Sequence, residues 1–274
     1  MNDAHAALEA IGTLPDVEID IGAAAIQLAR VDAPEADWRD AMLHLSVLAR
    51  GIAARVAAAG ANAADRGAAL ADLIAGHHGY RGDTVGYDDP ANANLIRVIE
   101  RRKGLPVALG ILWLHCARAV DWPAHGIDFP GHFLLGLGGT GSQAVIDVFA
   151  GGAAMDARGL RGLIKAVEGP EAELRPGLMR PMSARGVLLR LQNNIKLRRL
   201  RGQDLAGALA CTEDMLRIAP GEAALWREAA LMNQRLDRVT AALLCFDRFV
   251  ALMPPGEAAA RARAAIDELR ARLH

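Results

Sequence analysis

The 274-residue sequence has only three cysteines, few aromatic residues (4%) and almost no net charge (−1). The cysteines fall in predicted helices, so they indicate no disulfide framework. Near-neutral charge argues against a general binder of nucleic acid or membrane surfaces. The apolar stretch over residues 107–120 is too short to cross a membrane, and the N-terminal residues lack the basic and apolar regions of a secretory signal. We therefore expect a cytoplasmic protein with no nucleic-acid or membrane partner.

The segment between residues 92 and 152 is the most informative part of the sequence. Residues 107–120 are apolar on nearly every face, which predicts a buried central helix. Pro106 stands in its first turn, where a missing N–H costs nothing. The helix is expected to end at residues 121–123, before a short strand over residues 124–127.

A β-hairpin is predicted next. Residues 132–137 and 144–149 are β-branched and aromatic runs on either side of a glycine-rich stretch. A turn symmetric about residues 139 and 140 would place His132 directly opposite Asp147, within side-chain reach. A carboxylate beside an imidazole fixes its tautomer, so this pair could be the base and orienting group of a Cys/His/Asp catalytic unit. The alternative is a structural pair that closes the hairpin.

The order of helix, strand, His strand and Asp strand resembles the transglutaminase-like branch of the papain-type superfamily. In that branch a Cys begins the helix, and His and Asp follow on adjacent strands. Setting residues 118–123 on the family's helix ending places the family's Cys at Pro106, with His132 and Asp147 in the other two roles. A proline has no heteroatom that could attack an acyl group. The resemblance therefore implies a transglutaminase-like fold whose nucleophile is missing.

A closer resemblance is to the bacterial SirB-type family, which joins a transglutaminase-like core to a tetratricopeptide tail. It is carried by residues 88–92, 98–106, 129–134 and 146–152. In that family the nucleophile position is commonly not Cys. The fold therefore transfers to this chain better than any chemistry does.

Other nucleophiles are poorly placed. Cys116 lies nearly three helical turns from Pro106, about 15 Å away, in an apolar setting that raises the pKa of a thiol. Ser142 lies in the predicted hairpin turn and has no obvious base. A core cysteine and a turn serine are the simpler interpretations.

We predict neither a metal nor a cofactor. The adjacent pair His77-His78 does not have a metal-ligand spacing. A site formed by either residue with His132 and Asp147 is the alternative. His44 falls within a helical apolar pattern and is expected to be a hydrogen-bonded core or boundary residue.

Three further residues are candidates for the cleft. Asn92 begins a predicted helix over residues 92–102, and Tyr87 belongs to a glycine-containing loop over residues 76–91 that could border the cleft. Arg102 could reach over Pro106. The run of basic residues that includes Arg102 more simply complements a helix dipole.

The C-terminal third contains an internal repeat. Pro220 and Pro254 are 34 residues apart, and the same offset relates Cys211 to Cys245, which is the tetratricopeptide period. Two repeats are fewer than an independent solenoid needs, so we expect the tail to dock on the core and to end in a helix over residues 256–273. The tail is expected to bind a protein or peptide partner. Its candidate contact residues are Trp226, Asn233 and Arg199.

These patterns predict an α+β protein. Its papain/transglutaminase-like core packs a central helix on a small antiparallel sheet, with N-terminal helices over residues 21–31, 37–59 and 63–75 and an all-α tetratricopeptide-like tail. The predicted domains are residues 1–184 and 185–274. No oligomeric state is predicted.

Two functional classes are consistent with the sequence. The preferred one is a non-catalytic scaffold that acts as an adaptor or regulatory protein, because Pro106 leaves His132 and Asp147 with no thiol to activate. The alternative is a hydrolase or acyltransferase in which His132 activates a water, or a nucleophile borrowed from the substrate, and Asp147 orients the imidazole.

Overall fold

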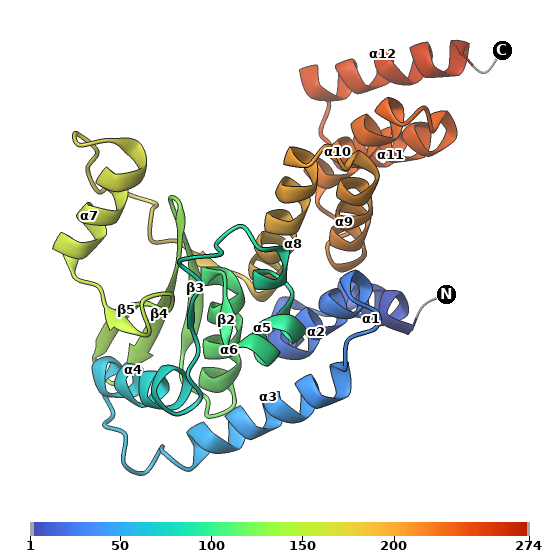
Figure 1. Cartoon of the computed structure of the whole chain (residues 1–274). Coiled ribbons are helices and arrows are strands. Elements are labelled where there is room, and N and C mark those ends of the chain that lie inside the picture. The colour runs from blue at the N-terminus through green and yellow to red at the C-terminus, as the bar shows by residue number, and fades with distance from the viewer. Residues whose placement is uncertain (1–2, 273–274) are drawn as a thin grey trace. The chain divides into compact units, whose positions relative to one another are not determined.

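The computed structural model describes residues 3–272, and these divide into two units (Figure 1). The core unit contains residues 15–191, and the repeat unit contains the described parts of residues 1–14 and 192–274. The core unit combines helices with a small antiparallel sheet, and the C-terminal region is helical. The predicted α+β class is confirmed. The domain boundary between residues 184 and 185 stays a prediction.

Most helices of the core unit precede its sheet. The helical elements that lie wholly in this unit are η1 (Asp16–Glu18), α2 (Ile21–Asp32), α3 (Trp38–Ala53), α4 (Ala63–Ala71), η2 (Asp72–His77), η3 (Pro90–Asn92), α5 (Leu95–Arg101), α6 (Pro106–Arg118) and α7 (Ala157–Glu168). Side chains of Asp20, Asp37 and Asn94 accept hydrogen bonds from backbone N–H groups in the first turns of α2, α3 and α5. Two predicted helix boundaries are wrong, since α3 ends at Ala53 and α5 begins at Leu95.

The main sheet has five antiparallel strands in the order β6-β5-β4-β3-β7. They are β3 (Ala124–Phe129), β4 (His132–Gly139), β5 (Ser142–Asp147), β6 (Ala153–Ala154) and β7 (Pro181–Met182). Two short parallel strands, β1 (Arg81–Gly82) and β2 (Lys103–Gly104), pair separately, and β2 leads directly into α6.

The β4–β5 hairpin forms as predicted, but its predicted register is wrong. Gly139 pairs with Ser142, so the turn residues are Thr140 and Gly141, and Gly141 has a φ of +63°. Leu135 consequently pairs with Ile146, whereas a turn centred on residues 139 and 140 would pair it with Ala144. The shift is two residues, and because side chains alternate with a period of two, His132 and Asp147 remain on the same face of the hairpin.

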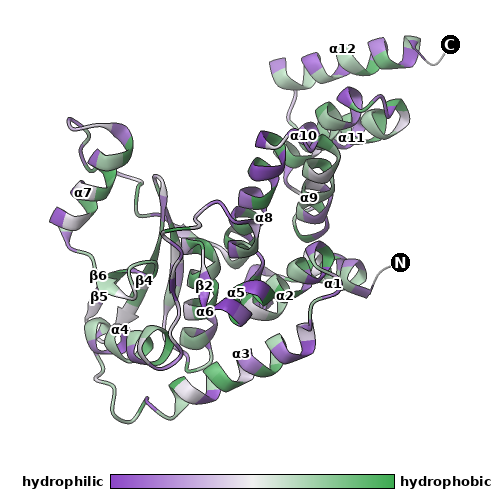
Figure 2. Cartoon of the chain, viewed as in Figure 1, coloured by the Kyte–Doolittle hydropathy of each residue, from purple (hydrophilic) through white to green (hydrophobic). Residues whose placement is uncertain are grey.

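Helices α6 and α7 cover opposite faces of the sheet (Figure 1). α6 is mainly hydrophobic along its length (Figure 2) and packs on the face that carries Phe133. A Cβ atom on Gly110 of α6 would lie 2.1 Å from Phe133 Cε1. α7 packs Leu160 and Ile164 on the other face, against a cluster that includes Leu134.

The repeat unit contains α1 (Asp3–Thr13), α9 (Leu205–Ile218), α10 (Ala223–Arg235), α11 (Val239–Leu252) and α12 (Glu257–Ala271), and α8 (Ala184–Arg201) runs into it from the core unit. α1 packs closely on α9, since a Cβ atom on Gly12 would lie 2.1 Å from the carbonyl oxygen of Arg217. His5 Nε2 also lies 3.4 Å from the buried carboxylate of Asp214. Within residues 3–272, no helix combines the length and the apolar character needed to cross a bilayer.

Candidate functional site

The hairpin brings His132 and Asp147 together. His132 Nε2 donates a hydrogen bond to Asp147 Oδ2 at 3.3 Å. In the observed register the two residues are diagonal rather than directly opposite, and diagonal neighbours remain within reach of long side chains. Within residues 3–272, the other imidazole nitrogen of His132, Nδ1, makes no hydrogen bond, and 23% of the side chain is exposed. In this tautomer the unprotonated nitrogen is therefore the one that is not bound to the carboxylate.

Asp147 is held as a carboxylate. Burial acts to raise the pKa of this side chain, but the hydrogen bond from His132 and the backbone N–H groups of Phe149 and Ala150 lower it below its ordinary value. Oδ1 accepts from those two N–H groups at 2.9 and 3.1 Å. One oxygen therefore fixes the chain after β5, and the other orients the imidazole.

One aromatic ring borders the His132 imidazole, and a second packs against the first. The Phe149 ring lies 6.5 Å from the imidazole, centre to centre, in an edge-on arrangement. The Tyr87 ring lies 6.0 Å from the Phe149 ring, centre to centre. Tyr87 is 43% exposed, so this predicted cleft residue is at the surface near the pair. Phe149 was missed from the sequence, although its position two residues after Asp147 in a predicted strand places it on the same side of the hairpin.

The start of α6, where the resemblance predicted the nucleophile position, lies beside the same loop. Gly82 of β1 pairs with Gly104, two residues before Pro106, and Gly82 N donates to the carbonyl oxygen of Phe149 at 3.2 Å. β1 is thus flanked by the start of α6 on one side and by the end of the His/Asp hairpin on the other. Pro106 is the first residue of α6 and is buried. Its ring offers neither a proton donor nor a nucleophilic atom.

The other nucleophiles considered from the sequence are engaged elsewhere. Cys116 is fully buried, and burial raises the pKa of its thiol to about 12, so the thiolate is absent at neutral pH. Ser142 Oγ accepts a hydrogen bond from the backbone N–H of Ala63 at 2.8 Å, so it fastens the hairpin turn to the start of α4.

Asn92 is fully buried and organises the loop that carries Tyr87. Its amide nitrogen donates to the Gly86 carbonyl at 2.7 Å and to the buried carboxylate of Asp83 at 3.3 Å. Its backbone carbonyl accepts from Leu105 N at 2.9 Å, directly before Pro106. Arg101 joins the network through an ion pair with Asp83 at 3.3 Å. Asn92 therefore positions the loop and the start of α6 from inside the protein.

Arg102 takes part in a cluster that the sequence did not predict. It ends α5 in the left-handed region, with φ of 58°, and its guanidinium donates to Tyr80 Oη and lies 2.6 Å from His44 Nε2. The rings of His44 and His78 are 5.2 Å apart, and those of His78 and His77 are 4.8 Å apart. Burial, with the charges of Arg102 and His78, lowers the pKa of His44 to about 4. A neutral His44 can accept the Arg102 hydrogen bond, whereas a protonated one cannot.

Because of this cluster, the folded protein is expected to be less stable in acid. The pKa of His44 is about 4 in the folded protein and 6.5 in its unperturbed state, so the stability that the neutral ring provides is complete above about pH 6.5 and is lost progressively down to about pH 4. We expect the urea concentration at the unfolding midpoint to decrease as the pH is lowered from about 7.5 to about 5. The decrease should be smaller than the pKa shift of His44 implies, because His44 is partly exposed. His44→Gln should flatten this dependence. An unchanged pH dependence in the variant would contradict it.

The arginine that contacts the His132 backbone was missed from the sequence. Arg190 of α8 donates to the His132 carbonyl oxygen at 2.6 Å and forms an ion pair with Asp128 of β3. Its guanidinium carbon lies 5.8 Å from the centre of the Phe133 ring, and burial lowers the pKa of the side chain. No local pattern links residue 190 to residue 132, because they lie on an α-helix and a strand that are 58 positions apart.

The three partner-contact candidates of the tail have different environments. Trp226 is partly buried and donates from Nε1 to the Pro220 carbonyl at 2.8 Å. Arg199 donates to the Gly207 carbonyl at 3.0 Å. Asn233 is 2% exposed, and its amide donates to the Ala229 carbonyl at 3.0 Å, so its side chain offers no surface to a partner. For the part of the chain described, no set of three His, Cys, Asp or Glu side chains could hold a metal ion.

Comparison with known families agrees with this arrangement. A profile of the transglutaminase-like superfamily matches residues 39–193, which is more than half of the chain. The chain belongs to the transglutaminase-like superfamily. A tetratricopeptide-repeat profile matches residues 195–272 of this transglutaminase-like protein. The two matches confirm the predicted combination of a transglutaminase-like core with a repeat tail.

Several known proteins are similar to this transglutaminase-like chain. A "UPF0162 protein" of Xylella fastidiosa is 30% identical over 179 residues, which cover 64% of this chain and 64% of that protein. A "UPF0162 protein" of Vibrio cholerae is 29% identical over 181 residues, or 66% and 67% of the two chains. "F-box only protein 21" of Mus musculus is 31% identical over 70 residues, or 26% of this chain and 11% of that protein. The match thus spans less than two thirds of the Xylella relative.

Proposed function

We propose that this protein is a non-catalytic transglutaminase-like scaffold that acts through protein interactions, as an adaptor or regulatory protein. The observation that carries the proposal is the buried Pro106 at the first turn of α6, where the superfamily resemblance expects the nucleophile. Within residues 3–272, no thiol or hydroxyl is hydrogen-bonded to the His132 ring. Without an attacking atom, the His132–Asp147 pair has nothing to activate in covalent acyl transfer.

The tetratricopeptide region supports the interaction role. Such repeats stack helices into surfaces suited to peptide or protein partners, and they occupy residues 195–272. The proposal includes a protein or peptide partner bound by this region, a cytoplasmic location, a domain boundary between residues 184 and 185, and membership of the SirB-type family. It includes no metal, cofactor or nucleic acid.

A second candidate function is favoured by the open nitrogen of His132. In the neutral ring that donates from Nε2 to Asp147, Nδ1 is the unprotonated nitrogen, and the side chain is partly exposed. An imidazole oriented by a carboxylate can act as general base for a water molecule, which requires no protein nucleophile. The candidate is therefore a hydrolase or acyltransferase that uses His132 and Asp147 with water or with a nucleophile from the substrate.

His132→Ala separates the two proposals. The purified full chain would be incubated with glutaminyl acyl donors plus amines and with ester and amide substrates, and turnover would be measured against buffer. The scaffold proposal expects the wild-type protein and His132→Ala to give the same background rate. Loss of the imidazole should leave the thermal midpoint within a few degrees of wild type, because the ring is partly exposed.

Phe149→Leu is the matched control, since it changes the neighbouring ring but keeps the imidazole and Asp147. The scaffold proposal fails if wild type turns over a substrate, His132→Ala abolishes that turnover with an unchanged thermal midpoint, and Phe149→Leu retains it. A general-base role predicts in addition that the rate follows a single titration with pH.

A further inference from the structure

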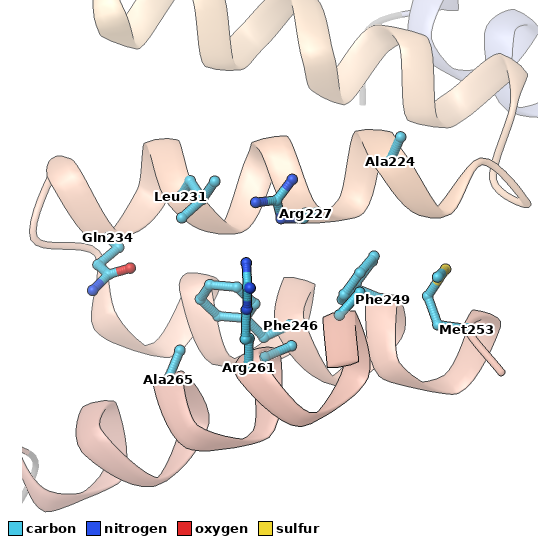
Figure 3. A pocket seen from close by; sticks show the side chains of 11 residues that line it. Ala224, Arg227, Leu231, Gln234, Phe246, Phe249, Met253, Arg261 and Ala265 are labelled. Atoms are coloured by element: carbon cyan, nitrogen blue, oxygen red, sulfur yellow. The ribbon is translucent and has the colours of Figure 1, made fainter. Parts of the chain in front are cut away.

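The repeat unit contains a groove between α10 and α12, with α11 at its floor (Figure 3). We call it the α10–α12 groove. Its volume is about 480 Å³, within the range of about 300–1,000 Å³ that is typical of ligand pockets. All of its lining residues belong to the region matched by the tetratricopeptide profile.

The floor of the groove is apolar. Phe246 and Phe249 of α11 are 3% and 4% exposed and belong to the hydrophobic core formed by α10, α11 and α12. Leu231 of α10 lines the groove and is 39% exposed. The walls also carry alanines, at positions 224 on α10 and 258 and 265 on α12. Short wall side chains over an aromatic floor leave space for apolar side chains of another segment.

The charges at the groove are all positive. Arg227 on α10 and Arg261 on α12 approach it from opposite walls (Figure 3), and no Asp or Glu lines it. Within the described chain, Arg227 forms no hydrogen bond or ion pair. Arg261 pairs with Glu257 one turn earlier on the same helix. Both members of that pair are more than three-quarters exposed, so an incoming carboxylate can replace Glu257 at small cost.

We propose that the α10–α12 groove binds an acidic amphipathic helix of a partner protein. Two roughly facing helices with an apolar floor suit a third helix whose apolar residues recur every three or four positions. Acidic residues on the flanks of that helix would meet Arg227 and Arg261, which makes the charges complementary. This inference rests on the interaction role proposed above and gives the chemistry of the partner.

The test uses synthetic peptides and the full chain. The probe is a fluorescent peptide of about 15 residues, long enough to form helix on binding, with leucine or phenylalanine at every third or fourth position and glutamate on both flanks. A second peptide carries lysine in place of each glutamate. Fluorescence anisotropy should show that the glutamate peptide binds and that its affinity falls as salt is raised, while the lysine peptide binds at least about tenfold more weakly.

Variants at exposed positions locate the site without disturbing the core. Arg227→Glu and Arg261→Glu should each weaken binding of the glutamate peptide by about fivefold or more, and Leu231→Ser by about tenfold. The matched controls are Arg263→Glu, on α12, and Leu244→Ser, on α11. Both residues are exposed and do not line the groove, so both variants should keep affinity within about twofold of wild type.

Four outcomes would overturn the proposal. The first is equal or tighter binding of the lysine peptide, and the second is no binding of either peptide. The third is binding that the control variants weaken as much as the groove variants do. The fourth is self-association of the chain that Arg227→Glu abolishes, which would make a second copy the occupant. None of these outcomes depends on His132, so failure here is distinguishable from failure of the scaffold proposal, which only His132-dependent turnover would cause.

Discussion

Gly110→Ala is expected to destabilise the core unit by about 2–3 kcal/mol, although alanine is the better helix former by about 1 kcal/mol. The added Cβ would lie 2.1 Å from Phe133 Cε1. The Phe133 ring is held between Gly110 on α6 and Gly126 on β3, where a Cβ would lie 2.7 Å from the other edge of the ring. It is 1% exposed. Because the ring has no free space on either side, the helix and the sheet must separate.

Gly162→Ala on α7 is the matched control for that experiment. Gly162 is also inside a helix, but a Cβ there meets no atom within 4 Å, so the substitution should be neutral or stabilise by up to about 1 kcal/mol. Unfolding free energies from urea titrations of both variants give the comparison. Combining Gly110→Ala with Phe133→Leu should recover part of the lost free energy of unfolding, since the smaller leucine side chain leaves room for the added Cβ atom. Equal stability of the two glycine variants would refute the close contact.

Asp147→Ala is expected to destabilise the folded protein by about 2 kcal/mol at neutral pH and to release the loop that carries Phe149. The substitution removes the acceptor of three hydrogen bonds, from His132 Nε2 and from the N–H groups of Phe149 and Ala150. Asp147→Asn retains an oxygen for the two backbone groups and should cost about half as much. The difference in free energy of unfolding between Asp147→Ala and Asp147→Asn separates the contribution of the backbone hydrogen bonds from that of the charged contact with His132.

The pH dependence of Asp147→Asn gives the sign of the electrostatic contribution. The pKa of Asp147 is lowered in the folded protein, so its contribution is present above the ordinary value of 3.8 and is lost as pH falls through the lowered folded pKa. Wild type and Asp147→Asn should therefore differ at about pH 7 and converge towards about pH 3. Urea titrations at both pH values test this. A difference that persists undiminished in acid would mean that the carboxylate charge is irrelevant.

The hairpin illustrates how far the sequence could be interpreted. The β-branched and aromatic runs over residues 132–137 and 144–149, on either side of a glycine-rich stretch, predicted two strands and the turn between them. The register depended on choosing two turn residues among four glycine-rich positions. The turn predicted at residues 139 and 140 excludes Gly141, which adopts positive φ in the structure. Since the displacement was two residues, His132 and Asp147 still meet, by a diagonal contact instead of a direct one.

Contacts between distant segments could not be predicted in the same way. Arg102 and His44 are 58 residues apart and meet only because α3 and α5 pack together. Asn92 was predicted as a cleft residue at the start of a helix. Its amide instead fastens the Tyr87 loop through Gly86 and Asp83. A single sequence has no local signal for such partners, because they depend on tertiary packing.

The pairing of α1 with α9 constrains how the protein can be cut and synthesised. α1 precedes the core unit in the chain and α9 follows it, yet both belong to the repeat unit. A fragment that starts at residue 185 therefore lacks one of its own packing partners and would expose the face of α9 around Asp214 and Arg217. During translation α1 cannot pack on α9 until more than two hundred further residues have been synthesised. We expect a truncated tail to keep this packing only if residues 1–14 are supplied through a linker or as a separate peptide.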